Sequence, residues 1–160
     1  MNYLGYDQEK LEGVVTNLND LLSNYHVYYQ NLRNFHWNVK GQHFFDLHVK
    51  FEELYNDARL KIDEIAERVL TLRHRPTALF SEYLVQSDIK EAQNVDDAYQ
   101  MVEEILKNHK ILIAKLRVVI ESAGNAGDEG TIDIMGSFLE NLEKSSWMLD
   151  AWSHRASVMN

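Results

Sequence analysis

The side chains best suited to chemistry lie in the stretch between His36 and Glu67. Two histidines, His36 and His48, stand twelve residues apart. Two carboxylates, Asp63 and Glu67, stand four residues apart, a spacing that places both on one helix face, one turn from each other. Two imidazoles and two carboxylates form a ligand set suited to a borderline metal such as iron or zinc.

One copy of the chain cannot close such a site. If residues 46–72 form one helix, His48 and Asp63 are fifteen positions apart, which separates them by about 22 Å along its axis. A metal ion holds its ligands within a few ångströms, so the spacing predicts a site shared by two chains.

Each candidate ligand also has a structural interpretation. His36 ends an apolar stripe, where a core histidine is common, and Asp63 and Glu67 lie beside core positions, where acidic residues usually form a solvated flank. Glu52, one turn after His48, is either an auxiliary ligand or a surface charge. None of the seven histidines follows Glu or Asp by three residues, so the Glu-x-x-His motif of di-iron sites inside helical bundles is absent.

Composition and periodicity predict one all-α domain spanning residues 1–160. Pro occurs once and Gly seven times, and apolar residues recur in steps of three and four over 8–39, 46–72, 94–124 and 131–155. The segment 74–94 is too long for a turn between antiparallel neighbours, which indicates a crossover holding a short helix. The expected fold is a four-helix bundle with one long crossover between its second and third helices.

Capping residues predict where the third helix begins and ends. Asn94 is a good N-cap, and Asp96 and Asp97 in the first turn would favour the positive end of the helix dipole. Gly124 is the expected end, and the fourth helix is expected to start near Thr131.

The charge balance limits the possible partners. The formal charge is −9, and an acidic protein repels DNA and phospholipid but attracts cations. The absence of cysteine excludes disulfides and thiolate catalysis. No apolar run is long enough for a membrane helix, and no secretory signal is visible, so we expect a cytoplasmic protein.

The motifs together resemble those of the Dps family (DNA-binding proteins from starved cells), the miniferritins of the ferritin-like superfamily. The matching elements are His-Trp at 36–37, a second histidine at 48, and Asp-Glu-x-x-Glu-Arg at 63–68. The segment GDEGTIDIMGSFLENLEKSSWML also resembles the fourth helix of the family, so the resemblance covers nearly the whole chain.

The resemblance implies a ferroxidase, with His36 and His48 contributed by one subunit and Asp63 and Glu67 by its twofold mate. Glu52 falls where the family often has an acidic residue in contact with the metal. Iron (Fe2+/Fe3+) would be bound without an organic cofactor and oxidised, preferably by hydrogen peroxide. The family stores ferric mineral in a hollow homododecamer and so protects against oxidative damage.

The helical geometry agrees with a shared site. Two copies of the second helix, crossing antiparallel with the axis near Tyr55 and Asn56, would place His48 of each copy opposite Asp63 of the other. Such an isologous contact makes two equivalent sites.

Many members of the family bind DNA through a mobile tail rich in Lys and Arg. Residues 1–12 contain one lysine against three acidic residues, and the carboxyl end offers only His154 and Arg155. Because phosphate neutralisation supplies nearly all non-specific DNA affinity, we expect weak or absent DNA binding. The basic sequence Arg-His-Arg at 73–75 is one local exception, and a DNA-shielding nucleoid protein built from the same shell is the alternative function.

An acidic cluster and one tryptophan each have two possible interpretations. Asp128, Glu129 and Asp133, near the start of the fourth helix, either complement its dipole or line a pore that draws Fe(II) inward, as in the family. Trp37 is either an interface aromatic or a side chain that takes up an oxidising equivalent beside His36.

Overall fold

The computed structural model describes residues 1–154, and this part of the chain contains five helices and no strand. Arg155, the predicted end of the fourth helix, lies outside the described residues. The five helices are α1 (Gln8–Asn38), α2 (Phe44–Thr71), α3 (Phe80–Gln86), α4 (Ala98–Ala126) and α5 (Glu129–Ser153). The predicted all-α bundle, with a short helix in the crossover, is confirmed.

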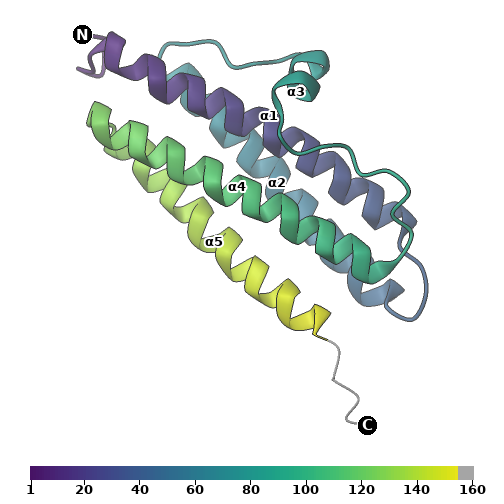
Figure 1. The fold of residues 1–160 in the computed structure, drawn as a ribbon. Coiled ribbons are helices and arrows are strands. Elements are labelled where there is room, and N and C mark those ends of the chain that lie inside the picture. The colour runs from purple at the N-terminus through teal and green to yellow at the C-terminus, as the bar shows by residue number, and fades with distance from the viewer. Residues whose placement is uncertain (155–160) are drawn as a thin grey trace.

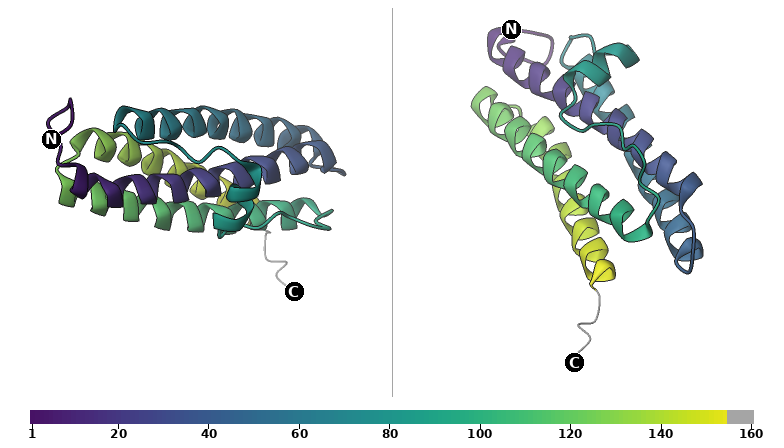
Figure 2. Two further views of the ribbon diagram at one scale, coloured as in Figure 1. Left: turned by 90° about the horizontal axis from the view of Figure 1, so that it is seen from above. Right: turned by 45° about the vertical axis from the view of Figure 1, so that its right-hand side comes forward.

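The four long helices lie side by side, and the crossover that carries α3 runs along the outside of α1 (Figures 1 and 2). α1 packs against α2, α3 and α4, and α4 packs against α5. The contacting stripes are those predicted from the periodicity, because burying an apolar face is what stabilises an amphipathic helix. No helix in the described part of the chain combines the length and apolar character that a membrane span requires.

The predicted ends of α4 were wrong. Asn94 does not cap this helix: it adopts a left-handed φ of 56°, which asparagine tolerates, inside the crossover. The N-cap is Asp97, whose side chain accepts a hydrogen bond from the Gln100 amide at 3.0 Å. α4 also continues past Gly124, because Gly127 supplies the left-handed cap at a φ of 68°.

The crossover is fastened to α1 by asparagine side chains. Asn24 Oδ1 accepts hydrogen bonds from the backbone N–H groups of Asp88 and Ile89, at 3.0 and 3.1 Å. Asn31 accepts from the Ala92 N–H at 2.9 Å and donates to the Lys90 carbonyl at 3.0 Å. These contacts satisfy backbone groups that have no partner in a helix or sheet, so an irregular segment can lie against the bundle.

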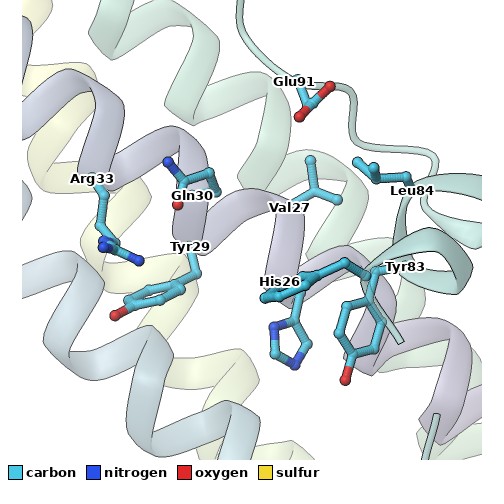
Figure 3. A pocket seen from close by; sticks show the side chains of 9 residues that line it. His26, Val27, Tyr29, Gln30, Arg33, Tyr83, Leu84 and Glu91 are labelled. Atoms are coloured by element: carbon cyan, nitrogen blue, oxygen red, sulfur yellow. The ribbon is translucent and has the colours of Figure 1, made fainter. Parts of the chain in front are cut away.

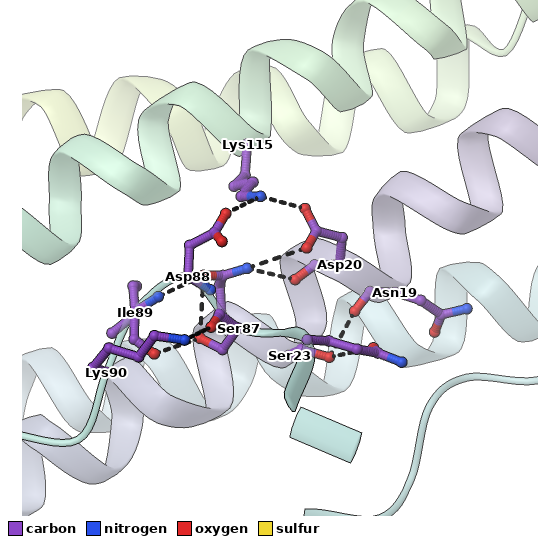
Figure 4. Close-up of polar contacts among 10 residues, drawn as sticks. Asn19, Asp20, Ser23, Ser87, Asp88, Ile89, Lys90 and Lys115 are labelled. Atoms are coloured by element: carbon purple, nitrogen blue, oxygen red, sulfur yellow. Dashed lines mark hydrogen bonds and ion pairs between the residues drawn. The ribbon is translucent and has the colours of Figure 1, made fainter. Parts of the chain in front are cut away.

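An ion cluster also holds the crossover against the bundle. The Lys115 ammonium on α4 lies 2.8 Å from an oxygen of Asp20 on α1 and 2.5 Å from an oxygen of Asp88 on the crossover (Figure 4). One cation therefore joins three separate segments of the chain.

The centre of the bundle holds a short polar chain. Tyr28 Oη and His109 Nε2 are 2.8 Å apart, and His109 Nδ1 lies 2.8 Å from Ser146 Oγ. Because the Ser146 hydroxyl donates its proton to the Leu142 carbonyl, its oxygen accepts from Nδ1–H, and Nε2 accepts from Tyr28. Burial, reinforced by the charge of Lys61, lowers the pKa of His109 to about 3. His109 is thus a neutral, fully bonded core residue.

Candidate metal site

His36 and His48 lie face to face where the end of α1 meets the beginning of α2. Their rings stack with centroids 3.9 Å apart and planes inclined by 15°. His36 Nδ1 lies 2.7 Å from the His48 backbone oxygen, and His48 Nδ1 lies 2.7 Å from the His36 backbone oxygen. The two residues therefore exchange a matched pair of hydrogen bonds.

This exchange decides which ring nitrogens remain for a metal. A carbonyl oxygen can only accept, so each Nδ1 carries its proton and each neutral ring keeps its lone pair on Nε2. His36 lies in the last turn of α1, where carbonyl groups lack an intrahelical partner, and His48 supplies one. Metal-binding histidines usually have their second nitrogen held by such a carbonyl, which orients the ring.

Two aromatic residues fix the rings from outside. Phe44 stacks on His48 with centroids 4.8 Å apart, so His48 lies between Phe44 and His36. The Tyr55 ring meets the His36 ring at 5.2 Å and 89°. His36 is buried and His48 is half-buried. The imidazole pair is therefore held in place before any metal arrives.

The candidate carboxylates lie further along α2. Asp63 and Glu67 are exposed, and neither makes a side-chain hydrogen bond or an ion pair within the described residues. Glu52 is exposed and unpaired in the same way. Among residues 1–154, no group of three or more potential ligands lies close enough together to hold a metal ion. Within one chain, the two candidate histidines therefore lie apart from the candidate carboxylates Asp63 and Glu67.

Arg68, which follows Glu67, reaches away from the carboxylates into the bundle. Its guanidinium lies 2.5 Å from the carboxylate of Asp128, which is fully buried, and its Nε donates to Thr131 Oγ1 at 2.9 Å. Gly130 permits this approach, because a Cβ there would stand 2.9 Å from the guanidinium. Nothing in the residue spacing predicts this contact, because no sequence pattern joins α2 to the start of α5.

The position of Asp128 corrects one of the pore candidates. Its carboxylate accepts from the Thr131 N–H at 3.1 Å, which caps α5, and is otherwise occupied by Arg68 and the Thr131 hydroxyl. A fully buried carboxylate with these partners is a helix cap, not a side chain lining a pore. Glu129 and Asp133 are exposed and remain candidates.

An apolar hollow of about 420 Å³ opens between α1 and α3 (Figure 3). Tyr29 and Arg33 line it from α1, and Phe80 and Leu84 line it from α3. It contains none of the five candidate ligands. Phe80 is 81% exposed, so this side of the chain presents apolar surface to its surroundings.

Trp37 is exposed beside the histidine pair. The Arg33 guanidinium lies 4.9 Å from the centre of a Trp37 ring and 5.3 Å from that of Tyr29, within the range of a cation–π contact. These contacts are compatible with Trp37 as an interface aromatic and with Trp37 as a side chain that takes up an oxidising equivalent.

Comparison with known proteins gives consistent matches over most of the chain. The family model described as "Ferritin-like domain" matches residues 15–157. The chain is 43% identical to a "DNA protection during starvation protein" of Porphyromonas gingivalis, over 93% of this chain and 94% of that protein. It is 40% identical to an uncharacterised protein of Haemophilus influenzae, over 92% of both.

Two solved structures have the same architecture. The crystal structure of a Dps protein from Vibrio cholerae O1 superposes with a TM-score of 0.94 and 44% identity, covering 96% of this chain and 97% of that one. That protein is described as a member of a broad superfamily of ferritin-like diiron-carboxylate proteins. Dps from Staphylococcus aureus gives a TM-score of 0.87 and 43% identity, over 89% and 96% of the two chains.

Proposed function

This chain belongs to the Dps family of ferritin-like proteins, and on that premise we propose that it oxidises Fe(II) at sites shared between two subunits and stores the ferric product. The observation that supports this most directly is the locked pair of His36 and His48, whose Nδ1 atoms are both occupied by carbonyl oxygens. Two preoriented Nε2 lone pairs, without a hydrogen-bond partner in residues 1–154, would supply half of a metal site.

The other half comes from a second subunit. Asp63 and Glu67 stand one turn apart on α2, exposed and unpaired, so they can face the histidines of another chain. Glu52 stands one turn from His48 on its own chain and contributes a further carboxylate. With both halves present, iron meets two imidazoles and up to three carboxylates.

The ligand types suit iron as a substrate that arrives as Fe(II) and leaves as Fe(III). Neutral imidazole accepts Fe(II), while carboxylates favour the harder Fe(III). With hydrogen peroxide as oxidant, two Fe(II) ions lose one electron each, and peroxide takes up both electrons and two protons to give two waters. Ligation needs neutral imidazoles, so oxidation should slow as the medium is acidified.

The storage function requires assembly, and we propose a homododecamer. Besides the divided site, several large apolar side chains are exposed on the isolated chain, including Phe45, Phe80 and Val85. Exposed apolar patches mark interfaces when they are contiguous or flanked by polar rims. A native mass near twelve times the 18.7 kDa of one chain is expected.

DNA protection, named in the Porphyromonas gingivalis relative, is the second candidate function. We propose that this chain protects DNA indirectly, by removing Fe(II) and peroxide together, in keeping with a cytoplasmic location. Its formal charge of −9 opposes direct binding to phosphate.

The decisive experiment follows Fe(II) oxidation optically, with peroxide and with oxygen in parallel. The assembled protein should oxidise Fe(II) much faster than buffer does, and His48→Ala should abolish the difference. His74→Ala, at a histidine bonded to the Leu72 carbonyl near the other end of α2, is the matched control. Equal rates of Fe(II) oxidation for wild type and His48→Ala would contradict the proposed function.

A further inference from the structure

The face of α2 that carries His48 and Asp63 also carries four side chains between them. The stripe, in order, is His48, Glu52, Tyr55, Asn56, Arg59 and Asp63. Steps of three and four along a helix keep residues on one face, and with Tyr55 and Asn56 adjacent at its centre the stripe spans an arc of about 100°. Every member is exposed or half-exposed, and the stripe is therefore open to a partner.

The stripe contains two charges without partners. Glu52 and Arg59 are both exposed, and neither forms a hydrogen bond or an ion pair within residues 1–154. They stand seven residues apart on one helix, about 10 Å along its axis. Two opposite charges on a shared face, each unpaired within its own chain, fit a partner with the reverse arrangement.

A second copy of the same helix has that arrangement when it lies antiparallel. With the twofold axis between Tyr55 and Asn56, each residue faces the one equally far on the other side of the axis. His48 lies seven residues before Tyr55 and Asp63 seven after Asn56, which brings the two halves of the metal site together. In this register Glu52, three residues before Tyr55, faces Arg59, three residues after Asn56.

We propose that Glu52 of each subunit forms an ion pair with Arg59 of the other across this axis. The inference rests on the proposed shared site, because pairing His48 with Asp63 sets the register. A twofold contact repeats every interaction, so each subunit pair contains two Glu52–Arg59 contacts. Charged pairs of this kind fix register and exclude wrong alignments more than they add affinity.

The proposed ion pair would also affect the candidate iron site. Glu52 is one turn from His48, so Arg59 of the other subunit lies next to the candidate iron site. Its guanidinium orients Glu52 and offsets part of the negative charge contributed by Glu52, Asp63 and Glu67. Arg59 is in this sense a positioning residue: it does not itself touch the iron.

Charge reversal tests the pair directly. In E52R alone, arginine faces Arg59 at both contacts of a subunit pair, and in R59E alone, glutamate faces Glu52. Each variant should therefore lose about tenfold or more of its assembled fraction. When the two are co-expressed, a mixed pair has opposite charges at both contacts, and assembly should return. The E52R/R59E double variant should also assemble by itself.

The measurement is native mass spectrometry in chelator without iron, so that any role of Glu52 as a ligand does not enter. Co-expressed E52R and R59E chains should be present in equal numbers in every shell, because only mixed pairs form. Glu121→Arg and Lys110→Glu make the same charge changes at exposed, unpaired positions of α4 and serve as controls. Far-UV circular dichroism should show that each variant remains helical.

Two results would overturn the ion pair: single variants that assemble like wild type, or a binomial distribution of chain types in the mixed shells. If reversal prevents helix formation, Glu52→Gln and Arg59→Gln provide the test, and additive losses in their double variant would overturn the pair. A negative result for the ion pair would not contradict the shared metal site. Activity recovered by mixing His48→Ala and Asp63→Ala chains would keep that site even if Glu52 and Arg59 proved independent.

Discussion

His36 and His48 hold each other through their backbones: the Nδ1 of each ring lies 2.7 Å from the carbonyl oxygen of the other residue. The two bonds join the last turn of α1 to the second turn of α2, on either side of the loop that connects them. The same contact therefore has a structural role, closing the helix corner, and in the proposed site it would also have a chemical one, directing both Nε2 atoms to a metal. The two roles can be separated experimentally.

We expect His36→Ala and His48→Ala to destabilise the chain as well as inactivate it. Each removes one ring, its hydrogen bond to the other residue's carbonyl and the stacking contact between the rings, which should lower the free energy of unfolding by about 1–3 kcal/mol. Because each ring depends on the other, the double variant should cost less than the sum of the single ones, by about 0.5–3 kcal/mol. Urea denaturation of the wild type, the two single variants and the double variant measures this coupling. Strictly additive losses would show that the two histidines do not stabilise each other.

Mixing variants should reveal whether the site is shared. His48→Ala and Asp63→Ala, each expressed alone, should lose fast Fe(II) oxidation. In a mixed twofold pair, one site receives both substitutions and the other receives an intact histidine half and an intact carboxylate half. With random pairing about half the pairs are mixed, so roughly a quarter of the sites should recover.

The control for the mixing experiment is Glu64→Ala in place of Asp63→Ala, since Glu64 is an exposed neighbour on α2 with no side-chain partner in the described part of the chain. It should retain full activity by itself. Native mass spectrometry must show that the shells contain both kinds of chain. Activity fixed at the single-variant level in verified mixed shells would place each site within one chain and contradict the proposal.

The buried contact between Arg68 and Asp128 should be among the most sensitive in the chain. Asp128→Ala leaves a largely buried guanidinium without its carboxylate and removes the cap of α5, so we expect a loss of about 3–5 kcal/mol. Gly130→Ala should also destabilise, because the new methyl group meets the guanidinium. Glu129→Ala, at an exposed carboxylate next in sequence, should change the free energy of unfolding by less than about 1 kcal/mol. Equal effects at 128 and 129 would refute this interpretation.

Stability should fall in mild acid because of His109. Burial lowers its pKa in the folded chain from the ordinary 6.5 to about 3. Between those values the unfolded chain binds a proton that the folded chain does not, so stability is greatest above pH 6.5. It should decline by about 1.4 kcal/mol per pH unit as the pH falls. His26, whose pKa burial lowers to about 4, adds to the same trend.

His109→Gln isolates this contribution. The variant should be less stable than wild type at pH 7, and the difference should shrink toward pH 4, because glutamine does not titrate. Urea denaturation at a fixed protein concentration and several pH values measures the difference. His74→Gln, at a half-buried histidine near the end of α2, is the control. A difference between wild type and His109→Gln that does not change with pH would contradict the assignment.

Direct DNA binding should be absent near physiological salt. With a formal charge of −9 per chain, retardation of linear duplex should require low salt or divalent cations that bridge like charges. The basic positions Arg73 and Arg75 are both exposed and are the most favourable local site. Tight binding that persists in chelator and disappears in an Arg73→Ala/Arg75→Ala variant would show that these two residues overcome the acidic surface.

The sequence alone determined the helices and the types of side chain in the candidate site. Apolar residues at steps of three and four can be buried only by a helix that packs along one face, so the four long helices followed from spacing. The separation of His48 and Asp63 along α2 likewise followed from the helical rise, and so did the prediction that a metal site formed by them would need a second chain. The ends of α4 did not follow, since Asn94 and Gly124 are as suited to capping as Asp97 and Gly127. The path of the crossover selects Asp97, and the turn between α4 and α5 selects Gly127.

The tertiary structure decided how individual side chains are used. Which nitrogen of His36 and His48 remains for a metal depends on how closely α1 approaches α2, because each carbonyl must come within hydrogen-bond reach of the other ring. Asp128 belongs to the interior because Arg68, sixty residues earlier, lies beside it once α2 and α5 are packed. Hydrogen bonds and buried ion pairs act over about 3 Å, and distances that short between remote residues exist only after the helices have packed.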